Sequence, residues 1–169
     1  MPVFRNAAVA AALICAAAAA PLTAKNATTQ NSAAKNVTAD IEQIANLLQR
    51  EGYQAKQSGD DGQRYIESSI SGWKYRIYFY GCNDAGKECT SVQYYAGFAP
   101  RTKPTLEAMN AYARENRFGL IYLDDEKDPN IEMDVNLEKG GMSEELFLGN
   151  LEFWDIVLSN FAEFAFKND

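Results

Sequence analysis

The segment from residue 73 to residue 98, WKYRIYFYGCNDAGKECTSVQYYAGF, decides the fold, because it reads as two strands joined by a turn. Apolar side chains alternate with other residues on both sides of the turn, with the two-residue period of a β-strand. If Cys82 lies opposite Cys89, every apolar residue of one strand meets an apolar residue of the other, and a one-residue slip destroys the match. The predicted pairs are Phe79 with Val92, Ile77 with Tyr94, Tyr75 with Ala96 and Trp73 with Phe98.

The N-terminus resembles a secretory signal. One basic residue, Arg5, precedes an apolar run at residues 7–20, which has the length of a signal-peptide core and is too short to span a bilayer. Cleavage after Ala24 would remove residues 1–24, together with Cys15. An uncleaved membrane anchor is the alternative. We therefore expect an exported protein, periplasmic or secreted, with no integral membrane segment once the signal is cleaved.

Two cysteines then remain, and we interpret them as a disulfide. An exported chain with an even number of cysteines favours a bridge, and the predicted register brings Cys82 and Cys89 together on the face opposite the apolar one. A zinc site needs four ligands, which a chain without histidine and without a second cysteine pair cannot supply in the usual way. A thioredoxin-like redox pair would have two intervening residues instead of six.

The rest of the chain extends this hairpin into one α+β domain. Residues 25–37 are small and polar and are predicted to form a flexible leader, so that the domain covers residues 38–169. We predict an antiparallel sheet, made of a three-stranded meander and a two-stranded hairpin, with helices packed on one face. The predicted order is a helix capped by Thr38 and ending at Gly52, strands at 66–70, 73–80 and 91–98, a helix from Pro104 to Gly119, strands at 120–123 and 131–137 with Pro129 in their connection, and a helix capped by Ser143.

Several segments are similar to the YbjN family of bacterial proteins, which are described as sensory-transduction regulators. They are IYFYGC, SVQYYAGF, NAYARENRFGLIYLDDEKDPNIEMDVNL and GGMSEELFLGNLEFWDIVLSNF, and together they cover most of the mature chain. The resemblance implies a fold similar to that of type III secretion chaperones, which are binding proteins that commonly dimerise and have no catalytic site. This chain departs from the better-known cytoplasmic members in its signal peptide and its cysteine pair.

The residue types present exclude the common nucleophile arrangements. Without histidine, and with both mature cysteines paired, neither a Ser-His nor a Cys-His pair can form. The acidic segment 124–132 superficially resembles a calcium loop, but Pro129 stands where an EF-hand needs glycine and Val135 where it needs the bidentate glutamate. We therefore predict a mobile, solvated turn, no metal and no cofactor. A carboxylate-based hydrolase or metal-dependent enzyme, with a site near the second hairpin, is the alternative function.

Charge and aromatic residues indicate a protein-binding function. From residue 124 to the end, acidic residues outnumber basic ones by 13 to 3, so nucleic acid is a poor candidate partner. The hairpin face opposite the apolar one carries cations and tyrosines, which combine large contact area with polar tips. We predict a binding surface there; the alternative is an ordinary exposed sheet face. The candidate binding residues are Lys74, Arg76, Tyr78, Tyr80 and Tyr95.

The last helix suggests contact with another protein or with a second copy, as a homodimer. Its apolar residues cover a wider arc than a coiled-coil seam, and Leu148, Ile156 and Phe166 lie outside that arc among acidic residues. A helix seated wholly in its own domain is the alternative. The residues of this arc are Phe147, Leu151, Phe153, Trp154, Val157, Leu158, Phe161 and Phe164; of the apolar residues of this helix, Phe147, Leu151, Trp154, Leu158, Phe161 and Ala165 recur at helical spacing.

Overall fold

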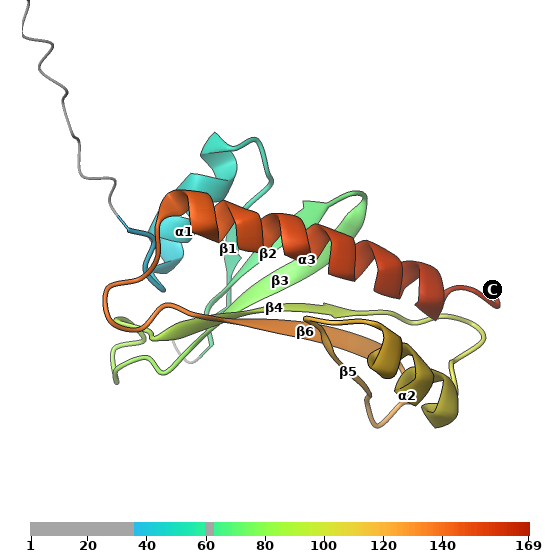
Figure 1. The fold of residues 1–169 in the computed structure, drawn as a ribbon. Coiled ribbons are helices and arrows are strands. Elements are labelled where there is room, and N and C mark those ends of the chain that lie inside the picture. The colour runs from blue at the N-terminus through green and yellow to red at the C-terminus, as the bar shows by residue number, and fades with distance from the viewer. Residues whose placement is uncertain (1–35, 60–62) are drawn as a thin grey trace, which may run out of the picture. The chain divides into compact units, whose positions relative to one another are not determined.

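The computed structural model describes residues 36–59 and 63–169. The predicted signal peptide, the leader up to residue 35 and the middle of the turn at residues 59–62 lie outside the described residues. The elements are α1 (Ile41–Arg50), β1 (Lys56–Ser58), β2 (Tyr65–Ile70), β3 (Trp73–Tyr80), β4 (Ser91–Gly97), α2 (Leu106–Glu115), β5 (Leu120–Leu123), β6 (Pro129–Asn136) and α3 (Glu144–Ala165) (Figure 1).

All six strands belong to one antiparallel sheet with the order β1-β2-β3-β4-β6-β5. The α+β class is confirmed, and the sheet is larger than predicted. The predicted meander and hairpin are joined because β4 pairs with β6 along its whole length. β1 was not predicted, since its three residues, Lys-Gln-Ser, carry no apolar alternation. Pro129 begins β6 and pairs with Leu123 instead of lying in the connection.

The predicted strand register is confirmed over most of its length. Ile77 pairs with Tyr94 and Phe79 with Val92, as the apolar pattern requires. The first hairpin also matches, with Ile66 opposite Ile77. The β3–β4 ladder ends at the pair of Arg76 with Tyr95, however, so the two pairs predicted beyond it are absent from the ladder.

The bridge between Cys82 and Cys89 is confirmed and closes the loop just beyond the paired part of this hairpin. The chain before α1 packs nearby, because Ala39 forms a β-bridge with Cys89 and Val37 forms one with Met142. Val37 is buried, so the folded domain includes at least this residue of the predicted leader.

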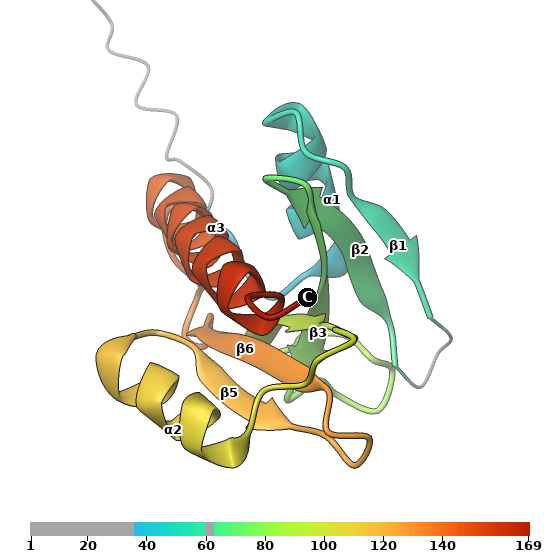
Figure 2. The same cartoon turned by 90° about the vertical axis from the view of Figure 1, so that its right-hand side faces the viewer.

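The helices have different relations to the sheet. Figures 1 and 2 show α3 lying across the concave side of the strongly curved sheet, with α1 on the same side at the β1–β2 end. α2 lies beside β5 and reaches α3 through Tyr112, whose ring is 5.4 Å from that of Phe161. The prediction that all helices pack on one face therefore holds for α1 and α3, while α2 flanks the edge of the sheet.

The core lies between α3 and the concave side of the sheet. The apolar residues of α3 that recur at helical spacing are all buried, whereas Phe153, which belongs to the predicted arc, is 49% exposed. Trp154 is fully buried, and its ring lies 5.5 Å from that of Tyr94. Of the apolar residues placed outside the arc, Ile156 is exposed, whereas Phe166 is partly buried. The Phe166 ring stacks on Trp73 at 5.9 Å and contacts Phe98 at 5.7 Å, at the end of the sheet where β3 and β4 separate.

Two helix ends differ from the sequence prediction, at the start of α1 and at the end of α2. Asp40, not Thr38, caps α1, and its carboxylate accepts from the backbone N–H of Gln43 at 2.7 Å. Asp40 is closer to the first turn, while Thr38 bonds to the side chain of Gln43 instead. α2 ends at Glu115, four residues before Gly119. The Ser143 cap of α3 is confirmed.

Candidate binding surface

The five candidate binding residues lie on the convex side of the sheet, which none of the described helices covers (Figure 2). β3 supplies Lys74, Arg76, Tyr78 and Tyr80, because alternate side chains of a strand point to the same side. β4 supplies Tyr95, which lies directly opposite Arg76. We call this convex side the open face.

Contacts with aromatic rings hold three of these side chains, those of Arg76, Tyr78 and Tyr95, in a fixed arrangement. The ring of Tyr78 lies 5.4 Å from that of Tyr65 on β2 and 5.8 Å from that of Tyr95 on β4. The Arg76 guanidinium lies 4.9 Å from the centre of the Tyr65 ring and donates a hydrogen bond to the Tyr78 hydroxyl at 3.1 Å. This hydrogen bond raises the pKa of Arg76. A surface ordered in this way loses less side-chain entropy when a partner binds.

A hollow of about 740 Å³ lies where β3 and β4 separate. Lys74 and Arg76 line it from β3, and Tyr95 and Gly97 line it from β4. Separation of the two strands beyond the Arg76–Tyr95 pair opens the sheet here. Lys74 is exposed and has no carboxylate within ion-pair distance among the residues that the structure describes. It therefore presents a free cation to the hollow.

A hydrogen bond at the edge of the hollow fixes Tyr95. The Tyr95 hydroxyl donates to Asn130 Oδ1 at 2.6 Å, and burial raises the pKa of Tyr95. Asn130 is 1% exposed, and its amide nitrogen donates to the carbonyl of Asp128 at 2.9 Å. Gly97 leaves room for this contact, because a Cβ there would lie 2.5 Å from Asn130 Oδ1.

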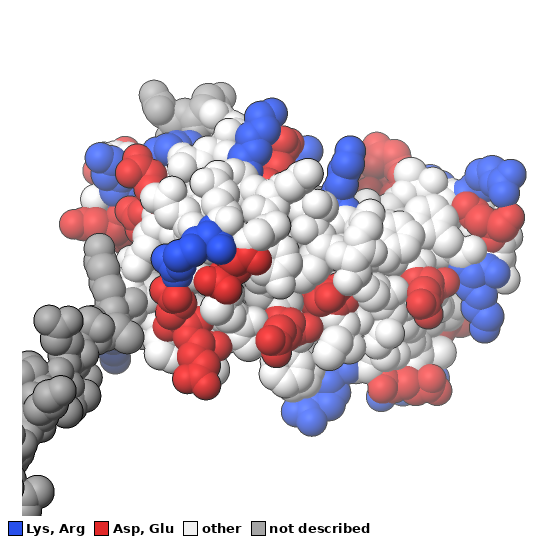
Figure 3. Space-filling view, turned by 90° about the horizontal axis from the view of Figure 1, so that it is seen from above, with Lys and Arg blue, Asp and Glu red and all other residues white. Residues whose placement is uncertain are grey.

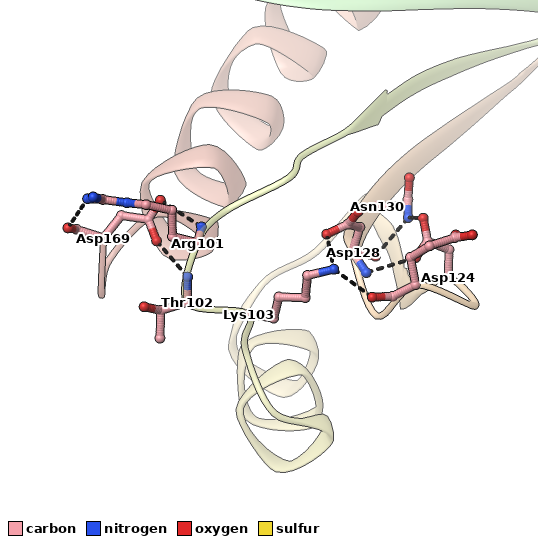
Figure 4. Close-up of polar contacts among 8 residues, drawn as sticks. Arg101, Thr102, Lys103, Asp124, Asp128, Asn130 and Asp169 are labelled. Atoms are coloured by element: carbon pink, nitrogen blue, oxygen red, sulfur yellow. Dashed lines mark hydrogen bonds and ion pairs between the residues drawn. The ribbon is translucent and has the colours of Figure 1, made fainter.

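Hydrogen bonds and an ion pair hold the acidic turn beside the hollow, for which the sequence predicts mobility. The Asp124 carboxylate accepts from the backbone N–H of Asp128 at 2.8 Å, which lowers the pKa of Asp124. Lys103, from the loop before α2, pairs with Asp128 Oδ1 at 2.8 Å and donates to the carbonyl of Glu126 at 2.6 Å (Figure 4). These bonds occupy two of the carboxylates that the hydrolase alternative would need.

The same loop is held to the end of the chain by a second set of bonds. Figure 4 shows Asp169 beside Arg101 and Thr102, whose backbone N–H groups donate to its carboxylate at 3.1 and 2.9 Å. These donors lower the pKa of Asp169. The loop between β4 and α2 is therefore anchored on both sides.

The acidic end of the open face was not singled out from the sequence. Glu132 on β6 accepts a hydrogen bond from the Tyr122 hydroxyl at 2.7 Å and another from the Gln93 amide at 3.2 Å. The β4–β6 pairing places Glu132 opposite Tyr95, so the face changes from cationic on β3 to anionic on β6. The two-residue alternation of β2 and β5 would have placed Tyr65 and Tyr122 on this face as well.

Among the residues that the structure describes, no group of three or more histidine, cysteine, aspartate or glutamate side chains could hold a metal ion. Within residues 36–59 and 63–169, no helix is both long and apolar enough to cross a membrane.

Comparison with models of protein families gives a match over most of the chain. Residues 40–166 match the model named YbjN, which carries the description "Putative bacterial sensory transduction regulator". The chain belongs to the YbjN family. Because the match spans α1 to the end of α3, it includes every helix and strand named above, with the open face and the two bridged cysteines. Comparison with curated proteins and with solved structures gives no match.

Proposed function

We propose that this YbjN protein is an exported, non-enzymatic binding module that acts in sensory transduction by holding a partner protein on its open face. In this role it is a regulator or a chaperone-like adaptor, and it requires no cofactor. The open face carries the proposal: none of the described helices covers it, Arg76, Tyr78 and Tyr95 are held in place on it, and Lys74 lines the hollow beside them.

The chemistry of the open face suits a protein partner. Tyrosine and arginine are enriched where protein surfaces meet, because they supply large contact areas together with hydrogen bonds. Lys74 and Arg76 lie at one end and Glu132 at the other, so a partner with complementary charges would bind in one orientation. A second copy of the chain is one such candidate, since the acidic end of one copy could meet the cationic end of another.

Export is supported by the first 24 residues and by the disulfide. The apolar run at residues 7–20 has the features of a signal-peptide core. Cys82 and Cys89 are bridged, and disulfides of this kind persist in oxidising compartments such as the periplasm. Cell fractionation, combined with alkylation before and after reduction, tests this part of the proposal. Cytoplasmic protein with both thiols free would refute it.

Affinity capture from an envelope extract tests the binding function. The immobilised wild-type domain is compared with a Lys74→Ser/Tyr80→Ser variant, which changes two exposed side chains of the open face and leaves the core intact. Leu106→Ser is the matched control, because Leu106 is 64% exposed at the start of α2 and lies outside the open face. We expect the same partner with wild type and control, and much less with the double variant. Equal recovery with all three proteins would contradict the proposal.

A further inference from the structure

An apolar groove lies on the helical side of the domain. It occupies about 310 Å³ between the end of α2, residues 116–119 and α3. Ligand-binding pockets usually have volumes of at least about 300 Å³, so this groove has room for a few side chains. Its lining is mainly apolar and includes Tyr112, Phe118, Ile121, Phe153, Ile156 and Val157.

Two aromatic rings and one aliphatic side chain at this groove are exposed. Phe118 is 55% exposed, Phe153 49% and Ile156 59%. The Phe118 and Phe153 rings contact each other at 5.0 Å, and the Arg117 guanidinium lies 4.9 Å from the Phe118 ring centre. Neighbouring exposed apolar side chains of this size typically mark an interaction surface.

The backbone at Phe118 adopts a conformation that is unfavourable for its side chain. Phe118 has a φ of 72°, in the left-handed region that bulky residues rarely enter. Strain of this kind costs on the order of 1–3 kcal/mol and concentrates at functional sites. Here the strained residue presents a large ring to solvent at the rim of the groove, where the ring adds nothing to the buried core.

The groove lining carries one charge of each sign, Glu115 and Arg117, and the acidic excess beside it comes from α3. Glu163 on α3 raises the pKa of the groove residue Tyr112 by its negative charge, after the larger effect of burial. Glu152 is exposed on α3 next to Phe153, and α3 contains no lysine or arginine. Figure 3, which views the molecule from the side on which α3 lies uppermost, shows separate acidic side chains along a surface that is otherwise mostly uncharged.

We propose that this groove binds an amphipathic helical segment of a partner protein, with apolar residues on one side and lysine or arginine beside them. Apolar residues at positions i, i+4 and i+7 of such a helix would enter the groove between α2 and α3. Its cations would meet Glu115 in the lining and Glu152 and Glu163 on α3, while Arg117 lies over the Phe118 ring. A second copy fits less well, because it would bring the acidic α3 of one copy against that of the other. This site goes beyond the proposed function, since it lies on the other side of the sheet from the open face.

Fluorescence anisotropy with designed peptides tests the groove. The first peptide is a helix with leucines at i, i+4 and i+7 and lysines beside them, and the second has glutamate in place of every lysine. We expect saturable binding of the lysine peptide, at least about tenfold tighter than that of the glutamate peptide. Equal affinities, or no saturable binding of the lysine peptide, would overturn the proposal.

Variants locate the binding site. Phe153→Ser should weaken binding of the lysine peptide by about tenfold or more, and Glu152→Gln/Glu163→Gln should weaken it and reduce its dependence on salt. Phe118→Gly should also weaken binding while unfolding at no lower temperature, because glycine relieves the strained backbone. Leu106→Ser is the control and should bind as wild type does. Undiminished binding by Phe153→Ser would overturn the proposal.

Sedimentation equilibrium distinguishes the second copy from a partner helix. The proposal expects no self-association that depends on the groove. A dimer in the wild type that is lost in Phe153→Ser would assign the groove to a second copy and would overturn the proposal. Results on the open-face variant are independent of this test, because Lys74 and Tyr80 do not line the groove.

Discussion

Replacing Tyr95 with phenylalanine removes one buried hydrogen bond and leaves the ring in place. The lost bond joins the Tyr95 hydroxyl to Asn130 Oδ1 at 2.6 Å. Asn130 is 1% exposed, so water cannot readily replace the missing donor. A buried acceptor left without its partner costs about 1–3 kcal/mol. Tyr95 itself is only partly buried, and we therefore expect the free energy of unfolding to fall by about 1–2 kcal/mol.

Tyr94→Phe is the matched control, because it makes the same chemical change at the neighbouring residue. Tyr94 is fully buried, and its hydroxyl has no hydrogen-bond partner among the described residues. Removing that hydroxyl breaks no protein hydrogen bond, so stability should stay the same or rise by up to about 1 kcal/mol. Burial also raises the pKa of Tyr94 well above its ordinary value.

The free energy of unfolding of both variants is measured by urea denaturation, with circular dichroism as the signal. The slope of the transition should remain unchanged, because the exposed area on unfolding stays the same. In thermal unfolding, Tyr95→Phe should lower the melting temperature by roughly 3–10 °C. If Tyr95→Phe is as stable as wild type, or if Tyr94→Phe loses as much stability, the hydrogen bond to Asn130 does not fix the edge of the hollow as argued.

Three further predictions concern stability. Replacing both cysteines, Cys82→Ser/Cys89→Ser, should lower the free energy of unfolding by about 2.5 kcal/mol, given the sequence separation of 7 residues, as measured by urea unfolding against the oxidised wild type. Gly119→Ala should destabilise the domain by roughly 1–3 kcal/mol in the same assay, because its Cβ would lie 2.9 Å from Ile131 Cδ1; a stability equal to wild type would contradict this packing. Burial raises the pKa of the Tyr75 hydroxyl in the folded state to about 12. The unfolded chain therefore loses this proton at a lower pH than the folded chain does. The free energy of unfolding should fall by roughly 2–3 kcal/mol as pH rises from about 10 to about 12. The Tyr75→Phe variant should lose less stability over that range, and an identical pH profile would argue against the assignment.

Apolar alternation predicts the paired part of the sheet because a register slip would expose the core face. This pattern, together with the turns between the strands, predicts the pairs of Ile77 with Tyr94 and of Ile66 with Ile77. The same pattern cannot show where a ladder ends. Trp73 and Phe98 still contact each other, with ring centres 5.6 Å apart, although the backbone ladder has ended. The apolar pattern therefore predicts the contact between the Trp73 and Phe98 side chains correctly, but it wrongly predicts that their backbones pair.

The alternation of apolar residues along single strands does not predict that β4 pairs with β6. These strands are separated by α2 and β5, and no short turn fixes their relative position. β1 was missed because Lys56–Ser58 pairs at the edge of the sheet and buries little.

The candidate site was predicted in part, for a similar reason. Alternation places Lys74 and Arg76 on one side of β3, and the hairpin adds Tyr95 opposite them. The hollow depends on where β3 and β4 separate, and the bond of Tyr95 to Asn130 depends on β6 lying beside β4. Both need the tertiary arrangement. The strained backbone at Phe118 also carries no signal in the sequence, since most non-glycine residues avoid that region.

Site-specific photo-crosslinking in intact cells tests most directly whether the open face binds a partner protein. A photoreactive phenylalanine derivative replaces Tyr80, which is 41% exposed on the open face, and in a parallel strain it replaces Leu106 as the control. We predict that the Tyr80 position forms a crosslink to another protein chain, and that Leu106 forms none above background. No crosslink from Tyr80 above the Leu106 level, with both proteins folded and exported, would contradict the account.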